Sequence, residues 1–243
     1  MTWLAWRQSR TSMAIVAGAV AVAALALVVT RPGLIDIYRA TGLDDCGTSC
    51  VDQASSFLIR ARAGAAGPLY WTGFAAVYLI PAVIGIFWGA PMVARELESG
   101  TFRLVWSQST TRSRWLAVKL AGGAAAAMAA AGLLSLAVTW WSAPFDRAYD
   151  NRLVAEVFGA RGVVPLAYAA LAFVLGVFIG TVLRRTVPAM ALTLVLVAAV
   201  QVVMPTMVRP HLIPPETFTG AVTAEGGFRE MQMSMDDGFM SVV

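Results

Sequence analysis

The stretch from Val93 to Leu120, VARELESGTFRLVWSQSTTRSRWLAVKL, gathers seven charged side chains between two long apolar tracts. The tract before it runs from Leu69 to Val93 and the tract after it from Leu120 to Trp141, and neither holds an Asp, Glu, Lys or Arg. Each tract exceeds the roughly 20 apolar residues that a helix needs to cross a bilayer. The stretch therefore predicts a charged loop between two membrane-spanning helices.

The composition of the whole chain agrees with this prediction. Hydrophobic residues make up 58% of the chain, charged residues make up 13%, and the mean hydropathy is +0.71. Soluble domains carry about a quarter charged residues, so most of this chain is expected to face a lipid bilayer. The sequence pI near 9.5 does not require nucleic acid, because the basic residues border the apolar spans, where lipid phosphate and topology account for them.

Five stretches are long and apolar enough to cross a bilayer, which predicts an all-α polytopic membrane protein. These spans are 12–30, 69–93, 120–141, 164–183 and 187–207. They make up a transmembrane domain over 12–207, with 94–119 as its charged loop. Residues 1–11 carry Trp and Arg side chains suited to the headgroup layer, which predicts an interfacial amphipathic segment.

The distribution of basic residues predicts that the N-terminus is cytoplasmic. In that orientation the segments 1–11, 94–119 and 184–186 are inside. The two sides carry equal numbers of Lys and Arg, but those inside lie close to the ends of the spans, where the positive-inside bias is counted. The loop 94–119 is then cytoplasmic and 208–243 is extracytoplasmic.

The loop contains signals for two short helical pieces and a turn. Arg95 and Glu98 are three residues apart and share a helical face. Gly100 weakens a helix interior by about 1 kcal/mol and predicts a break. The segment 102–106 then places apolar side chains on one side of a short helix. Arg112 and Arg114 begin the next helix, where the macrodipole disfavours cations, so lipid phosphate or an acidic partner surface is expected beside them.

The loop resembles the cytoplasmic loop of the type-2 ATP-binding-cassette (ABC) permeases, the membrane subunits of exporters. The shared pattern is an acidic pair, a Gly-Thr, an apolar turn, a Thr-Arg bend and a Lys-Leu at the start of the next span. The matching positions are Glu96 and Glu98, Gly100-Thr101, Leu104-Val105, Thr111-Arg112 and Lys119-Leu120. The stretch FWGAPMVARELESGTFRLVWSQS especially resembles the sequences of the actinobacterial branch of that family.

The resemblance implies a dimeric export permease in a bacterial plasma membrane, driven by a separate ATP-binding subunit. The second permease is another copy or a homologue, and ATP and magnesium belong to the ATP-binding partner. The loop 94–119 is then a coupling helix that docks on that partner. The residues that the resemblance marks for coupling are Glu96, Glu98, Gly100, Thr101, Arg103, Arg112 and Arg114.

The family pattern has six spans, and the sequence contains five. The segment 208–243 resembles the start of the extracytoplasmic part that precedes a sixth helix. Either the protein continues into a sixth span, which we expect, or this member of the family ends outside.

The sequence lacks the motifs of several enzyme classes. The sequence has no G-x-x-x-x-G-K-[ST], and its one Lys is Lys119, so the chain is not expected to hydrolyse ATP itself. It has no H-E-x-x-H, and no G-x-S-x-G beside a His, so hydrolase activity is not expected. We predict no catalytic residue, no metal site and no cofactor in this chain.

Two cysteines lie close together in the predicted outer loop. Cys46 and Cys50 can form a local disulfide in an oxidising exterior if the backbone brings their Cα atoms within about 7 Å. Two free thiols and, less favoured, a metal site remain open alternatives. The methionines of MQMSM, residues 231–235, have the spacing of a soft copper site, but chance explains that spacing in a Met-rich chain.

The predicted spans hold few polar groups, of which we single out Thr139 and Gln201. Charged groups inside a span usually mark ion or proton pathways, so their absence from these five stretches disfavours a proton-coupled secondary transporter. Gly85/Gly89 and Gly176/Gly180 have the G-x-x-x-G spacing that allows close helix contact; in so Gly-rich a chain, chance accounts for it about as well.

Three classes of function stay open: an ATP-driven exporter permease, a secondary transporter or channel that works alone, and a membrane anchor or sensor whose loop binds another protein. The sequence does not name a substrate. Drug, lipid, peptide and antibiotic all fit.

Overall fold

The computed structural model describes residues 2–45, 50–100, 112–149, 159–208, 211, 233–236 and 239–242. Contacts within the chain divide it into two units, Met1–Ala198 and Ala199–Val243. The helical elements are α1 (Thr2–Ala40), α2 (Val51–Ala63), α3 (Ala66–Ile84), η1 (Gly85–Gly89), α4 (Ala90–Glu98), α6 (Arg112–Tyr149), α8 (Val164–Leu183), α9 (Thr186–Val203) and η2 (Met204–Val208).

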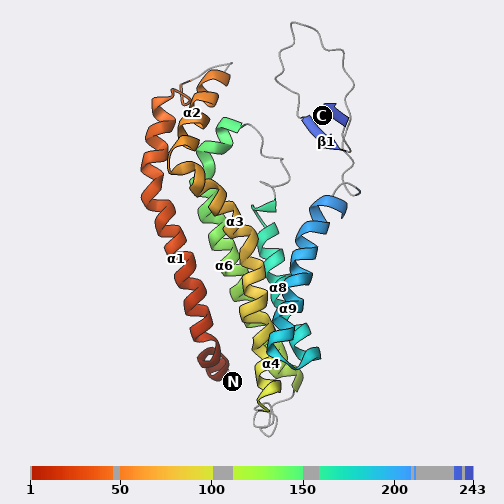
Figure 1. Ribbon diagram of the computed structural model, residues 1–243. Coiled ribbons are helices and arrows are strands. Elements are labelled where there is room, and N and C mark those ends of the chain that lie inside the picture. Colours follow the sequence, from red (N-terminus) through yellow and green to blue (C-terminus); the bar gives the residue numbers. More distant parts are fainter. Residues whose placement is uncertain are drawn as a thin grey trace. The chain divides into compact units, whose positions relative to one another are not determined.

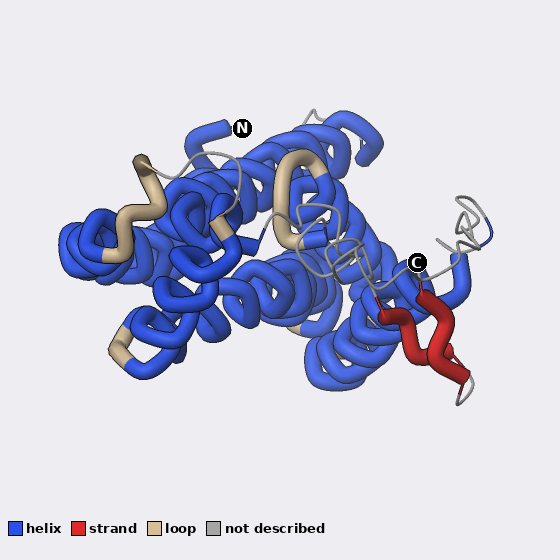
Figure 2. The backbone as a smooth tube through the Cα atoms, turned by 90° about the horizontal axis from the view of Figure 1, so that it is seen from above, coloured by secondary structure: helices blue, strands red, loops and turns tan. Residues whose placement is uncertain are grey.

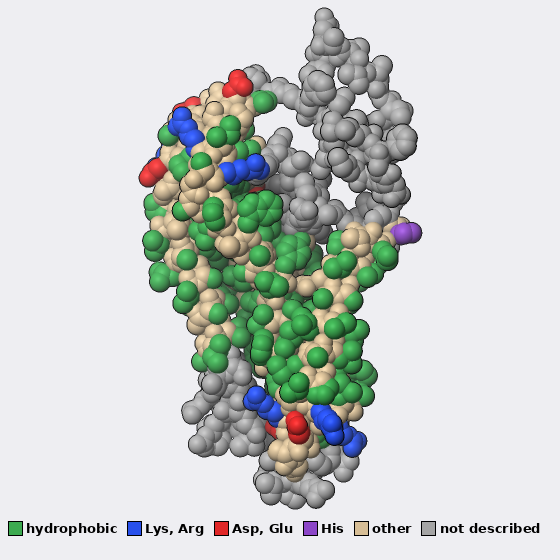
Figure 3. All heavy atoms as spheres, in the orientation of Figure 1, with side chains coloured by type: hydrophobic (Ala, Val, Ile, Leu, Met, Phe, Trp, Pro, Cys, Tyr) green, Lys and Arg blue, Asp and Glu red, His purple; other side chains and the backbone are tan. Residues whose placement is uncertain are grey.

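The fold is all-α and polytopic, as the sequence predicts. Within the described residues, five helical segments are long and apolar enough to cross a membrane: Ala14–Ala40, Ala66–Glu98, Ser113–Ala148, Val164–Leu183 and Thr186–Val208. The long helices of the first unit run roughly along one direction (Figure 1), so a view down that direction shows them nearly end-on (Figure 2). On the face drawn in Figure 3, hydrophobic side chains cover the middle of the described part of this unit, and charged side chains gather toward its ends.

Several elements differ in extent from the predicted spans. α1 continues without a break from Thr2 to Ala40, well beyond the expected end at Thr30. α2 was not expected at all, because its mixed sequence VDQASSFLIRARA lacks a membrane-length apolar run. A short antiparallel hairpin, β1 (Met233–Asp236) with β2 (Phe239–Val242), lies in the second unit, with Met233 opposite Val242. The interpretation of 208–243 did not include strands.

The described part of the first unit has two main apolar cores, one near each end of its helices. The α2 end contains an aromatic core in which Phe57, Trp141 and Phe145 are almost fully buried, and the rings of Phe57 and Phe145 meet edge-on at 5.4 Å. The loop end, where α4 ends and α6 begins, has a core built on Trp88 and Phe173, whose ring centroids are 5.8 Å apart.

A glycine contact joins α8 to the helix formed by α3, η1 and α4. A Cβ added at Gly176 would lie 2.6 Å from the carbonyl oxygen of Gly85, and one at Gly180 would lie 2.5 Å from that of Ala90. The two G-x-x-x-G pairs thus face each other. Since apolar burial does not drive helix association in lipid, close backbone approach of this kind is a main source of packing energy.

The π-helical turn η1 lies in the middle of this contact. Ala90 donates its backbone N–H to the carbonyl of Gly85, five residues earlier. The next residue, Pro91, has no N–H to donate, which favours a local departure from the regular α-helical pattern. Such π-turns inside long helices often occur at functional sites.

We predict that Gly176→Ala destabilises the protein while Gly122→Ala does not. The first methyl group would overlap backbone of η1 and α4, and overpacking of this kind costs about 1–3 kcal/mol. The second would meet nothing within 4 Å and would gain helix propensity. Thermal unfolding of both purified variants in detergent measures the difference, and equal midpoints would contradict the glycine contact.

Candidate docking site at the loop end

The coupling loop begins where α4 ends. Ser99 closes the helix by donating its N–H to the carbonyl of Arg95 at 2.9 Å, and Gly100 follows with φ +73°. This left-handed conformation is the usual one for a glycine just past a helix end. Gly100 therefore makes the turn for which the sequence singled it out. Thr101 and Arg103, and the short helix predicted over 102–106, lie outside the described residues.

Glu96 and Lys119 connect the two ends of the loop. The Lys119 Nζ lies 2.5 Å from the Glu96 Oε1, with side-chain exposures of 6% and 13%. The ammonium also lies 4.5 Å from the centre of the Trp115 ring. Removing one partner of a buried ion pair typically costs about 3–5 kcal/mol, because the other charge stays buried. The pair thus fastens α4 to α6 at the base of the loop.

Glu98 makes a different contact, with the start of α9. Its Oε2 accepts hydrogen bonds from the Thr186 hydroxyl at 2.7 Å and from the Thr186 N–H at 3.1 Å. A carboxylate at a helix N-terminus satisfies free N–H groups and is favoured by the helix dipole. Glu98 therefore caps α9 from a neighbouring helix. The contact is exposed, so salt and water weaken it.

The geometry of α4 explains why two nearby glutamates have different partners. Residues two apart on a helix point about 200° away from each other. Glu96 consequently faces α6 and Glu98 faces the turn before α9. The E-x-E spacing in the sequence already indicates that the two glutamates point in different directions. It does not indicate that their partners are Lys119 and Thr186.

The surface around these contacts is basic. Arg95, Arg114, Arg184 and Arg185 are all exposed, and charged side chains cluster at this end (Figure 3). Arg112 is the first residue of α6, and its side chain lies outside the described part. The dipole of α6 does not favour cations here, so this surface suits an anionic neighbour.

Arg184 occupies a position where glycine is usual. It follows the last residue of α8 with φ +53°, and its N–H is bonded to the carbonyl of Gly180 at 3.1 Å. A non-glycine residue in this left-handed region costs roughly 1–2 kcal/mol. From the sequence, Arg184 is predicted only to lie on the cytoplasmic side. It lies two residues before Thr186, the residue that bonds Glu98.

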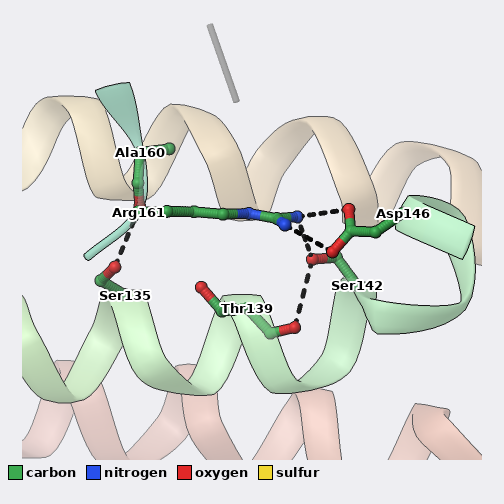
Figure 4. Close-up of polar contacts among 6 residues, drawn as sticks. All are labelled: Ser135, Thr139, Ser142, Asp146, Ala160 and Arg161. Atoms are coloured by element: carbon green, nitrogen blue, oxygen red, sulfur yellow. Dashed lines mark hydrogen bonds and ion pairs between the residues drawn. The ribbon is translucent and has the colours of Figure 1, made fainter. Parts of the chain in front are cut away.

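A second polar cluster lies at the α2 end (Figure 4). Arg161 pairs with both carboxylate oxygens of Asp146 and donates to the Ser142 hydroxyl at 2.9 Å. Ser135 donates to the carbonyl of Ala160 at 2.9 Å. These bonds hold the segment before α8 against α6. The sequence did not indicate them, because Asp146 and Arg161 lie outside the predicted spans.

The other residues that the sequence singled out are Thr139, Gln201, Cys46 and Cys50. The carbonyl of Thr139 accepts a long hydrogen bond of 3.5 Å from the Ser142 hydroxyl, and Gln201 lies in α9 within the second unit. Cys50 directly precedes α2 and Cys46 lies outside the described residues, so their disulfide stays a prediction. Among the described residues, no group of three His, Cys, Asp or Glu side chains could hold a metal ion.

These helices define a polytopic α-helical membrane protein. A family model described as ABC-2 membrane transporter related matches residues 17–209, which is most of the chain, and the chain belongs to this family. The match supports an ABC-2 type permease, as the loop resemblance implied; the actinobacterial branch stays a prediction. No curated protein and no solved structure matches the chain.

We predict that Glu96→Ala strongly destabilises the protein, whereas the double variant Glu96→Leu/Lys119→Met stays close to the parent. The single change leaves a buried ammonium without its carboxylate, at a cost of about 3–5 kcal/mol, while two apolar side chains of similar size leave no buried charge. Denaturation in detergent measures both. Glu98→Gln, on the exposed side of α4, is the matched control and should change stability little.

Proposed function

We propose that this chain is the permease subunit of an ABC exporter and that a separate ATP-binding subunit docks on its loop end. In this proposal the N-terminus and the loop end face the cytoplasm of a bacterial cell. Two permeases, identical or homologous, form the substrate pathway. ATP and magnesium bind to the partner, since this sequence lacks a P-loop.

The observation that carries the proposal is the pair of ties at the loop end. Glu96–Lys119 connects α4 to α6, and Glu98–Thr186 connects α4 to α9. The glycine contact connects α4 to α8. A partner that pushes on the loop would therefore displace four helices together. This is what an energy-coupling loop requires and what a plain topological loop does not need.

The basic surface supports a partner of acidic character. Arg95 and Arg114 flank the loop, and Arg184 and Arg185 form the neighbouring turn. Opposite charges across an interface speed association and select the partner. The strained Arg184 fits this view. A glycine would relieve the backbone strain, so an arginine at this position is expected only if its side chain has a function.

The first test is purification of the tagged chain in mild detergent, followed by mass spectrometry of proteins that co-elute. A stoichiometric P-loop ATPase would support the permease proposal. Elution without one, with any sixth helix included in the expressed chain, would favour an anchor or a secondary transporter. Dependence of transport on an ion gradient would then point to the secondary transporter.

We predict that Glu98→Lys lowers partner-stimulated ATPase activity several-fold and leaves membrane insertion intact. The lysine would repel Arg185 and leave the α9 N-terminus without its cap. Thr186→Val is the matched change on the other side of the bond, and it should give a smaller loss because the Thr186 N–H contact remains possible. Normal stimulated activity in Glu98→Lys would contradict the proposal.

Arg184→Gly separates docking from folding. Glycine adopts the left-handed conformation without strain, so the thermal midpoint should stay the same or rise by a few degrees. Loss of the guanidinium should nevertheless weaken binding of the ATP-binding subunit, most clearly at low salt. A titration of the partner at two salt concentrations measures this, and unchanged binding would remove Arg184 from the docking surface.

A further inference from the structure

Pro144 leaves a carbonyl group of α6 without its helical donor. It lies inside the helix Arg112–Tyr149, and proline has no backbone N–H. The carbonyl of Trp140, four residues earlier, would normally accept that N–H. Where water is scarce, a free carbonyl needs another donor.

Arg31 of α1 supplies that donor. Its Nη1 donates to the Trp140 carbonyl oxygen at 2.9 Å, and its guanidinium carbon lies 3.6 Å from the centre of the Trp140 ring. One guanidinium thus contacts both the backbone and the indole of the same residue. Arginine suits this task because its planar group can stack and donate together and stays charged.

The neighbouring residues Thr30 and Trp141 form a hydrogen bond in which α6 is the donor and α1 the acceptor. The Trp141 indole Nε1 donates to the Thr30 hydroxyl at 3.1 Å, and that hydroxyl donates to the Ala26 carbonyl at 2.7 Å. Thr30 and Arg31 therefore face Trp140 and Trp141 in a reciprocal pair. We call these four residues the α1–α6 joint.

The joint marks a boundary along α1. On its C-terminal side Leu34 and Tyr38 are 2% and 5% exposed, whereas Ile15 and Val22 on the N-terminal side are 68% and 69% exposed. Within 14–26, the described side chains before Leu27, not one is buried. Figure 1 shows this part of α1, the free arm, standing apart from α6 of the same unit.

We propose that Arg31 is a positioning residue that replaces the backbone donor missing at Pro144, and that the α1–α6 joint is the pivot that sets the angle of the free arm. The inference does not depend on the docking proposal, because it concerns contacts within this chain. Its distinctive consequence is a coupling between Arg31 and Pro144. An arginine that served only to hold lipid phosphate would show no such coupling.

A double-mutant cycle tests the coupling in full-length protein reconstituted in lipid nanodiscs. Arg31→Met should lower the thermal midpoint by about 2–4 °C, as expected for a lost hydrogen bond in a chain of this size. In the Pro144→Ala background the restored amide can serve Trp140, so the same change should cost at most half as much. Equal losses in both backgrounds would overturn the proposal.

Two further variants complete the cycle. Arg39→Met removes an exposed arginine near the end of the same helix and should show no dependence on Pro144. If Arg31→Met cannot be purified, Arg31→Leu serves in its place with the same criterion, because its side chain also has no donor for the Trp140 carbonyl.

The pivot itself is tested by a distance. Spin labels at Gly18→Cys and Gly122→Cys, positions with nothing within 4 Å of an added Cβ, report the separation of the free arm from α6; Cys46 and Cys50 are replaced by Ser. Arg31→Met should broaden or shift the distance distribution by several ångströms, and Arg39→Met should leave it unchanged. An unchanged distribution in Arg31→Met would overturn the pivot.

Discussion

The close backbone contact between α8 and the α3–η1–α4 helix is the interaction on which the rest of the first unit depends. Inside a bilayer, apolar side chains gain little by leaving lipid for one another. Glycines at 176 and 180 instead let two backbones approach to distances at which any side chain would collide. This contact fixes α4, and α4 in turn presents Glu96 and Glu98 to their partners.

The two glutamates make contacts of different strength at the loop end. The Glu96–Lys119 pair is buried, so it is strong only while both charges are present, and it acts as a fixed tie. The Glu98–Thr186 contact is exposed, so it can open at low cost. A loop held by one fixed and one labile tie can transmit force and still change shape, which suits the coupling role proposed for it.

The spans were predictable from the sequence because the length of an apolar run is set directly by bilayer thickness. The Gly100 turn was predictable because glycine at that place has a local cause. The α2 helix and the ion pairs were not. The α2 helix has no long apolar run, and the partners of Glu96 and Asp146 come from other segments of the chain. The end of α1 was missed because Pro32 and Arg31 resemble a boundary, whereas the helix continues through both.

The prolines inside the helices show how the same local defect is handled in different ways. Near Pro91 the helix changes to a π-turn, which keeps the correction within one chain segment. At Pro144 the helix stays regular and a side chain of α1 takes the free carbonyl. The second solution adds a few polar contacts to the core packing that Leu34 and Tyr38 already give α1. Because none of the described side chains of the free arm, 14–26, is buried, the angle of this arm can change without exposing buried apolar surface.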